Sequence, residues 1–324
     1  MESIKYQDLS SYSLFFSASF SQSFLKKSYQ QQNIDGAEQK SYQNCYPFIY
    51  YLEHGKIYYQ QAELAPLVIQ PILLFYGFVH LIKACILTKD PHYPETTSVL
   101  AHGVSSRKRK KQHYRFLEDD VKLQKTGLFP FMSEKLFHMK QLEGDKVIME
   151  ELLAHIPELS PLFLKLEGKK TFAKVNFEKN SFYLSNKILD TYHMTENRFQ
   201  DFLTSKFQIP FLISSETDMI KVDMNIEHSI DNGTVVPFQF NIVENHYSFP
   251  LLKDKLFHLP EILIHYLLLY NLSMIARYET EWWSELIKMM PNNDYPFVQS
   301  FLNVTQKKGP FLIFEFLTNE GRGL

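Results

Sequence analysis

Two long apolar segments, far apart along the chain, carry narrow polar stripes at helical spacing. The first spans 71–87 (PILLFYGFVHLIKACIL) and the second spans 261–277 (EILIHYLLLYNLSMIAR). In a helix of about 3.6 residues per turn, Tyr76, His80 and Lys83 of the first segment lie on one face. Segments this apolar are predicted to be buried helices, and buried polar groups need partners. The stripes are therefore predicted to face each other or a common ligand.

The second segment has a stripe of the same kind, which consists of Tyr266, Tyr270, Ser273 and Arg277. A buried cation without a partner is costly, so Lys83 requires a carboxylate, a helix C-terminus or a bound anion. Arg277 has the same requirement, and Glu279 and Glu281 follow it closely in the sequence. Two interpretations remain open: structural networks that link the helices, or an anion pocket lined by Lys83, Arg277 and tyrosine hydroxyls. Such a pocket would admit a nucleotide or a phosphorylated metabolite.

The periodicity changes from helical to alternating between about 160 and 250. Apolar and polar residues alternate in 171–185, 219–230 and 235–249, which indicates strands. Asp231-Asn232-Gly233 lies between two such runs and predicts a hairpin turn. A helix is predicted over 199–207. The fold class is therefore α+β: a helical bundle formed by 1–155 and 256–324, with a β-containing insert at 156–255.

The remaining helical patterns lie on both sides of this insert. A helix is predicted to begin near Tyr46, with a weak point at Gly55. Helical character is predicted to return at Pro260, a typical first helical residue, and to continue through Leu286. The last apolar stretch is predicted to be a helix, a turn at Gly309-Pro310, and a terminal strand or helix.

Composition limits the possible classes of protein. The formal net charge is −2, so no global field would attract nucleic acid, and any such binding must come from a local patch. The two cysteines, Cys45 and Cys85, cannot form a disulfide framework or a cysteine-rich zinc site, and we expect buried, reduced thiols. No metal or cofactor is predicted, because glycine-rich phosphate loops and histidine pairs at zinc-binding spacing are missing from the sequence. The N-terminus lacks the pattern of a signal peptide, so we expect a cytoplasmic protein that does not span a membrane.

A basic run is the most obvious polar feature, and it consists of Arg107, Lys108, Arg109, Lys110 and Lys111. It is interpreted either as a phosphate-binding loop, for nucleic acid, nucleotide or lipid headgroup, or as a solvated loop neutralised by the acidic residues at 118–120. His102 lies just before the run and is followed by Gly103. It either forms a turn or presents its imidazole to a ligand.

Several stretches resemble a known family. They are QPILLFYGFVHLIKACIL, TSVLAHGVSSRKRKKQHY, GLFPFM and HYLLLYNLSMIARYETEWWSELI, and they resemble the YaaC-like family of uncharacterised bacterial proteins. The segment LSMIARYE, with the tryptophan pair that follows it, is the most specific. The resemblance implies a cytoplasmic protein of a Gram-positive bacterium and implies no activity.

A second and weaker similarity concerns the helix LLFYGFVHLIKACIL, which is similar to the aromatic-rich helix of HEPN-type bundles. Many HEPN domains are ribonucleases or nucleotide binders that have an arginine and a histidine with four to six residues between them. Arg107 and His113, with five residues between them, match that spacing. The resemblance implies a HEPN-like bundle and a ribonuclease as an alternative function. It also implies a homodimer, because such bundles often pair.

The predicted function is a non-enzymatic regulator that binds a nucleotide, a nucleic acid or a protein partner. The two cationic features and the missing catalytic signatures motivate it. The alternative is the ribonuclease that uses Arg107 and His113. A third interpretation is an interaction scaffold that uses Trp282 and Trp283, and packing of this pair over the core is the structural alternative.

Overall fold

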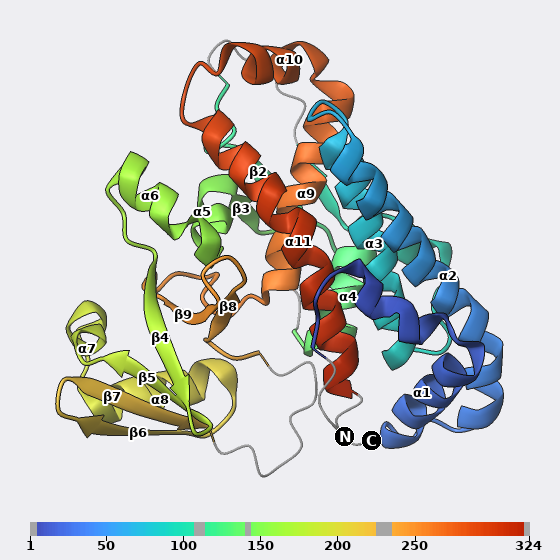
Figure 1. Ribbon diagram of the computed structural model, residues 1–324, viewed down its shortest axis with the longest axis horizontal. Helices are drawn as coiled ribbons and strands as arrows, with labels where there is room; N and C mark the ends of the chain where they lie inside the picture. The colour runs from blue at the N-terminus through green and yellow to red at the C-terminus, as the bar shows by residue number, and fades with distance from the viewer. Residues whose placement is uncertain (1–4, 107–113, 140–143, 225–234, 321–324) are drawn as a thin grey trace. The chain divides into compact units, whose positions relative to one another are not determined.

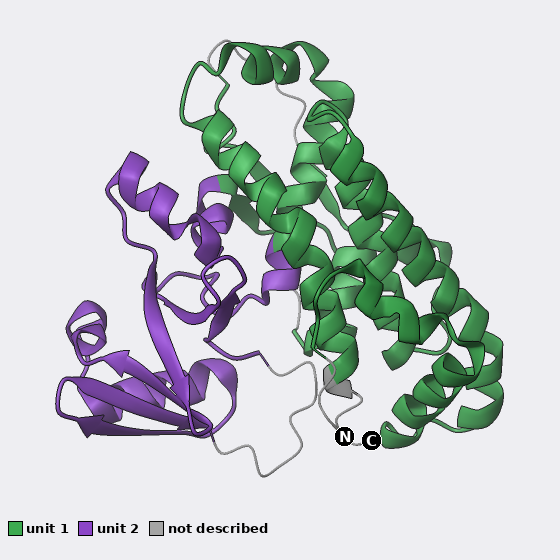
Figure 2. Cartoon of the chain, in the orientation of Figure 1, with its two compact units in different colours: residues 1–149, 265–324 green, residues 150–264 purple. Residues whose placement is uncertain are grey.

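The chain forms an α+β protein of two compact units. A computed structural model describes residues 5–106, 114–139, 144–224 and 235–320. The first unit consists of residues 1–149 and 265–324, and the second consists of residues 150–264 (Figure 2). The insert predicted at 156–255 falls inside the range of the second unit.

The first unit consists mainly of long helices (Figure 1). Its helices before the basic run are η1 (Leu9–Phe16), α1 (Ala18–Gln31), α2 (Ala37–Leu64), α3 (Gln70–Lys89) and η2 (Thr97–Leu100). Those after it are α4 (Leu128–Phe137), α10 (Thr280–Met289) and α11 (Asp294–Glu320). Helix α9 (Glu261–Tyr278) begins in the second unit and continues into the first.

The apolar segment 71–87 forms most of α3, as predicted, and the second apolar segment forms α9. Among the described residues, α3 is a helix that is long enough and apolar enough to cross a membrane. Of its most apolar stretch, 72% is buried inside the protein. Cys85 on α3 and Cys45 on α2 are both buried and are not joined in a disulfide.

Helices α2 and α3 approach each other closely because each has a glycine at the contact. A Cβ atom on Gly55 would meet the Leu81 side chain, at 2.5 Å from its Cδ2 atom. A Cβ atom on Gly77 would lie 2.9 Å from the Cβ of Tyr58. Gly55 is therefore a packing residue of a continuous helix, and the weak point predicted there does not interrupt α2.

One predicted helix start was wrong. Helix α2 begins at Ala37, well before the start predicted near Tyr46. The helical character predicted from Pro260 through Leu286 is present and is divided into two helices, α9 and α10, because the backbone departs from helical geometry at Glu279.

The turn predicted at Gly309-Pro310 was also wrong, because α11 continues through both residues. The Tyr59 hydroxyl lies where a side chain at position 309 would be, so glycine is required there for close packing. The carbonyl of Pro310 accepts a hydrogen bond of 2.6 Å from the Tyr12 hydroxyl. This dipeptide has a local preference for a turn, and tertiary contacts hold it in a helix instead.

The first unit also contains a small antiparallel sheet in the order β1-β2-β3. Its strands are β1 (Val104–Ser106), β2 (Asp120–Leu123) and β3 (Lys146–Ile148). The register pairs Val104 with Leu123 and Val121 with Val147, all buried, so one face contributes to the core. Strand β1 directly follows His102, and the sheet thereby fixes the position of that residue's loop.

The second unit is built on an antiparallel six-stranded sheet in the order β6-β7-β5-β4-β9-β8 (Figure 1). The strands are β4 (Phe172–Glu178), β5 (Ser181–Ser185), β6 (Phe211–Glu216), β7 (Met219–Met224), β8 (Gln239–Asn241) and β9 (His246–Pro250). The helices are α5 (Met149–Ala154), η3 (Pro157–Leu159), α6 (Ser160–Glu167), α7 (Lys187–Tyr192) and α8 (Glu196–Phe207).

The alternating patterns predicted strands β4, β5, β7, β8 and β9 of this sheet correctly, whereas β6 was not predicted. In β5 and β7 the buried residues alternate with more exposed ones, and Phe182 pairs with Val222 while Leu184 pairs with Ile220. Helix α8, predicted over 199–207, adds buried aromatic and leucine side chains to the same core. The hairpin predicted at 231–233 lies outside the described residues.

Candidate functional site

Helices α2, α3 and α9 bring cations, histidines and tyrosines together in the first unit. We call this group the cationic cluster, and its members are Tyr51, His54, Tyr58, Tyr76, His80, Lys83, His102, Tyr270 and Arg277. The predicted stripes of α3 and α9 meet within it. The Arg277 guanidinium donates a hydrogen bond of 3.1 Å to the Tyr76 hydroxyl and lies 5.8 Å from the centre of the Tyr76 ring.

His102 joins the cluster from the loop before β1. Its ring centre lies 5.6 Å from that of Tyr270 and 6.4 Å from that of Tyr76. The Tyr266 hydroxyl donates a hydrogen bond of 2.8 Å to the His102 carbonyl, which holds the loop in place. Burial, followed by the charges of Arg277 and Lys83, lowers the pKa of His102. Its imidazole therefore stays neutral at pH values where an exposed histidine would begin to charge.

His80 lies at the centre of the contact between α2 and α3. Its ring is stacked on that of Tyr58, with a centroid distance of 5.6 Å and an interplanar angle of 17°. The His54 ring approaches it edge-on at 5.2 Å. Burial lowers the pKa of His80 to about 4, with smaller contributions from Lys83 and His54. Its Nδ1 atom is buried and has no hydrogen-bond partner in the described part of the chain.

Lys83 is half-buried on α3, one turn beyond His80. Its Nζ atom lies 5.7 Å from the centre of the Tyr51 ring, a cation–π contact. Burial lowers the pKa of the Lys83 ammonium. The aromatic face compensates only part of the cost of removing this charge from water.

The two strong cations of the cluster have no acidic partner. In the part of the chain that the structure describes, neither Lys83 nor Arg277 forms an ion pair with a carboxylate. The sequence placed Glu279 and Glu281 within reach of Arg277, and that expectation was wrong. Arg277 instead donates to the Ser273 carbonyl, to the Tyr76 hydroxyl and to the Met274 sulfur atom.

Tyr270 closes the cluster on the α9 side. Burial raises the pKa of its hydroxyl, while the hydrogen bond with Ser106 and the charge of Arg277 act in the opposite direction. The other polar residues of the α9 stripe have local structural roles: Ser273 donates to the Tyr270 carbonyl, and Tyr266 holds the His102 loop.

The contribution of α2 was missed by the sequence analysis. Tyr51, His54 and Tyr58 are spaced at i, i+3 and i+7, which is one face of a helix. Tyrosines are so frequent in this segment that the sequence does not distinguish this face of the helix from the others. The histidine among the tyrosines was the available signal.

The other predicted sites lie apart from this group. The basic run Arg107, Lys108, Arg109, Lys110 and Lys111, together with His113, lies outside the described residues. Trp283 is buried and its indole donates to the Val68 carbonyl at 2.9 Å. The Trp282 ring packs edge-on against Tyr114, at 4.6 Å between ring centres. Both tryptophans therefore pack within the first unit, as the structural interpretation predicts.

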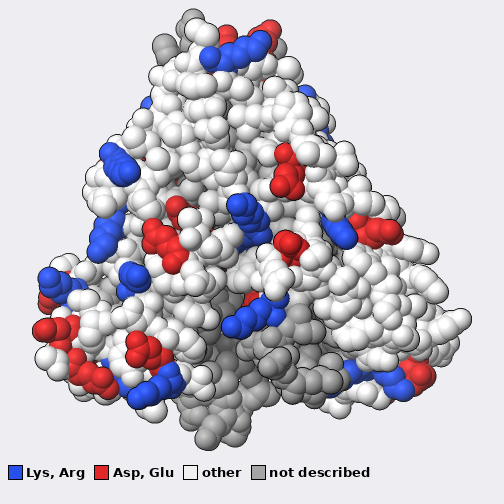
Figure 3. Space-filling model, in the orientation of Figure 1, with Lys and Arg blue, Asp and Glu red and all other residues white. Residues whose placement is uncertain are grey.

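Charged side chains elsewhere are of mixed sign. On the face drawn in Figure 3, lysine and arginine side chains are interspersed with aspartate and glutamate. In the described part of the chain, no group of three histidine, cysteine, aspartate or glutamate residues is placed to hold a metal ion. The cationic cluster is thus a local feature of a chain whose net charge is −2.

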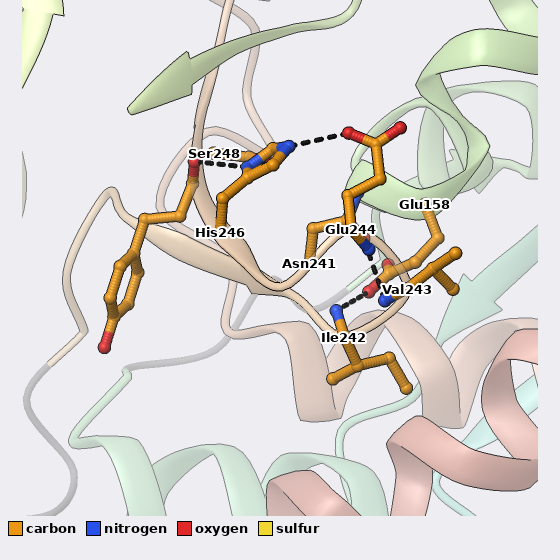
Figure 4. Close-up of polar contacts among 8 residues, drawn as sticks. Glu158, Asn241, Ile242, Val243, Glu244, His246 and Ser248 are labelled. Carbon is orange, nitrogen blue, oxygen red and sulfur yellow. Dashed lines mark hydrogen bonds and ion pairs between the residues drawn. The ribbon is translucent and has the colours of Figure 1, made fainter. Parts of the chain in front are cut away.

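The second unit has its own polar group at the turn between β8 and β9 (Figure 4). The Asn241 side chain accepts hydrogen bonds from the backbone N–H groups of Val243 and Glu244, at 3.0 and 2.9 Å. Glu158 accepts one of 2.9 Å from the N–H of Ile242. The Nε2 atom of His246 lies 2.7 Å from the Glu244 carboxylate. These polar groups satisfy the turn, so this group is structural.

The fold and the cluster define an α+β protein with a cationic, aromatic group of side chains held by three helices. The YaaC-like protein family model matches residues 13–317, and the chain belongs to this family. No curated protein and no solved structure matches the chain.

Proposed function

We propose that this protein is a non-enzymatic regulator that binds a phosphate-bearing ligand at the cationic cluster. The observation that carries the proposal is the arrangement of Lys83 and Arg277, two half-buried cations on different helices that share one aromatic surrounding without a carboxylate. A cation removed from water calls for a compensating anion. A ligand that supplies this anion would form with Lys83 and Arg277 the ion pairs that no carboxylate forms in the described part of the chain.

The donors of the cluster favour phosphate among possible anions. Arginine presents several N–H groups in a fixed plane and lysine presents a compact charge, and both are used widely for phosphate. His80 and His102 add imidazole nitrogens, and Tyr270 adds a hydroxyl. A phosphate group has several oxygens that point in different directions, so it accepts hydrogen bonds from donors on different helices, whereas a halide ion is a single atom.

A thermal-shift experiment tests the proposal. Purified protein is heated with inorganic phosphate, pyrophosphate, nucleotides or short RNA at low and at moderate salt. A ligand at about 100 times its dissociation constant adds ~2.7 kcal/mol to the free energy of unfolding, which raises the melting temperature measurably. We expect a shift that survives moderate salt, because the cluster is half-buried and weakly screened.

Two variants and a control locate the binding. Lys83→Met and Arg277→Met should each remove the shift while the unliganded protein remains folded. Lys56→Met is the matched control. Lys56 is on α2, and its Nζ atom lies 5.3 Å from the centre of the Phe16 ring, outside the cluster. A shift retained in both cluster variants, or lost equally in the control, would contradict the proposal.

The regulator is proposed to act in the cytoplasm, where phosphorylated metabolites and RNA occur together. The HEPN-like bundle and its ribonuclease activity stay predictions, since Arg107 and His113 lie outside the described residues. RNA cleavage that disappears in His113→Ala would establish that alternative. An RNA pool that stays intact over the purified protein would exclude it.

A further inference from the structure

Aromatic side chains form a row along the outside of α2, at every fourth position. The row consists of Tyr42, Tyr46, Tyr50, His54 and Tyr58. Residues four apart form a continuous ridge on a helix surface, and each step along it rises about 6 Å. The row therefore offers one ring per helical turn.

The first three rings of the row are largely in water. Tyr42, Tyr46 and Tyr50 are 70%, 56% and 54% exposed, and the ring centres of the last two are 6.0 Å apart. No charged residue occurs between positions 41 and 52. A run of exposed tyrosines without charged neighbours is an interaction surface, because tyrosine favours interfaces that are apolar at one end and wet at the other.

The row leads directly into the cationic cluster. His54 and Tyr58 belong to both, through their ring contacts with His80. Lys83 lies over the ring of Tyr51, the residue next to Tyr50. The exposed rings of α2 thus lead to Lys83 on α3, and Arg277 reaches the same cluster from α9 through its contact with Tyr76.

We propose that the aromatic row and the cationic cluster together bind single-stranded nucleic acid. One backbone phosphate lies at Lys83 and another at Arg277, and successive bases stack on the tyrosine rings of α2. The inference rests on the proposed function, because it uses the same cations and names the class of ligand. Single-strand-binding proteins combine these two elements, a cationic site for the backbone and aromatic side chains for the bases.

Charge and spacing favour this occupant over a protein. An apolar protein surface would cover the tyrosines but would leave the two cations at the end of the row without an anion. A mononucleotide would satisfy the cations and leave the outer rings unused. A strand has phosphates and planar bases at a regular repeat, and it supplies both.

Binding measured against strand length tests the inference. Fluorescence anisotropy is recorded with labelled oligouridylates of one, two, four and eight nucleotides. We expect the affinity of the unmodified protein to rise with length up to about four nucleotides. The triple variant Tyr42→Leu, Tyr46→Leu, Tyr50→Leu should bind the longer strands at least about tenfold more weakly, because each stacked base contributes substantially to such binding.

A matched control separates loss of stacking from loss of any exposed ring. Phe177 is 44% exposed on β4 of the second unit, and Phe177→Leu should leave every affinity unchanged. The salt dependence gives a second readout. Contact with one phosphate per cation predicts a slope of about −1.4 in a plot of log affinity against log salt, from about −0.7 per phosphate.

The outcomes distinguish this inference from the proposed function. If phosphate and mononucleotide bind, Lys83→Met abolishes that binding, and affinity is independent of length, the aromatic row is not used and only the further inference fails. If the triple variant instead changes the oligomeric state measured by light scattering, a second copy of the chain covers the row and the inference fails. If no phosphate-bearing ligand binds at all, both proposals fail.

Discussion

Two pairs of histidines, one pair from each unit, have opposite surroundings. In the second unit, the Nε2 atom of His155 lies 2.9 Å from both oxygens of the Asp254 carboxylate, and His246 is paired with Glu244. In the first unit, the charges that act on His80 and His102 come from lysine, arginine and another histidine. One arrangement is complete without a ligand. The other arrangement brings positive charges together, and in the described part of the chain no carboxylate compensates them.

The difference separates structural polar groups from candidate binding groups. A buried histidine beside a carboxylate is satisfied by the protein itself, and its removal should affect folding. A histidine beside uncompensated cations is held neutral and has no carboxylate partner, and its removal should affect binding more than folding. Three experiments test this contrast.

The largest effect is expected from removing His155. The side chain is 1% exposed and holds the Asp254 carboxylate, so His155→Ala leaves a cavity and a partly buried charge without its partner. We expect a loss of about 3 kcal/mol in the free energy of unfolding, measured with urea. His246→Ala is the matched control: its partner Glu244 is 53% exposed, and the expected loss is below about 1 kcal/mol. Equal losses in the two variants would remove the distinction between them.

A smaller effect is expected from pH. The folded state lowers the pKa of His80 to about 4, from 6.5 in the unfolded chain. Between these values the unfolded state binds more protons, so stability is complete above about pH 6.5 and falls as the pH drops toward 4. His80 is only half-buried, so solvent screening reduces its contribution to about 1 kcal/mol.

The variant His80→Gln isolates this contribution. Its free energy of unfolding, measured by urea titration at pH 7.0 and at pH 4.5, should fall less with pH than that of the unmodified protein. His193→Gln provides the control, because His193 is exposed in the second unit. If His80→Gln and the unmodified protein lose equal stability on acidification, the imidazole of His80 is not held neutral in the folded state.

The smallest effect on stability is expected from Lys83→Met. Methionine retains the apolar stem and removes a half-buried charge without a carboxylate partner, so we expect a change within about 0.5 kcal/mol, or a slight gain. Thermal unfolding without ligand measures it. A loss of several kcal/mol would identify Lys83 as a structural residue and would place the cluster in the same class as His155 and Asp254.

The sequence allowed prediction of the features that depend on periodicity. Apolar runs predicted α3 and α9, alternation predicted all the strands of the second unit except β6, and the i, i+4, i+7 stripe identified Tyr76, His80 and Lys83 as one face. These features follow from local geometry, which is encoded in neighbouring residues.

Long-range partners were beyond such reasoning. The sequence neighbours of Arg277 suggested glutamates, but its side chain reaches Tyr76, which is 201 residues away in the chain. Gly309-Pro310 has the local signature of a turn, and contacts from Tyr12 and Tyr59 keep it helical. Tertiary packing decided both cases, and no local pattern reports it.

The glycine contact between α2 and α3 has a consequence for the speed of recognition. Gly55 and Gly77 let the two backbones approach so closely that a side chain at either position would collide with the facing helix. The side chains that α2 and α3 contribute to the cluster are therefore held in position before any ligand arrives. A preformed site of this kind needs no closing motion, so its association rate should approach that of an unobstructed encounter, and differences in affinity between ligands should appear as differences in residence time.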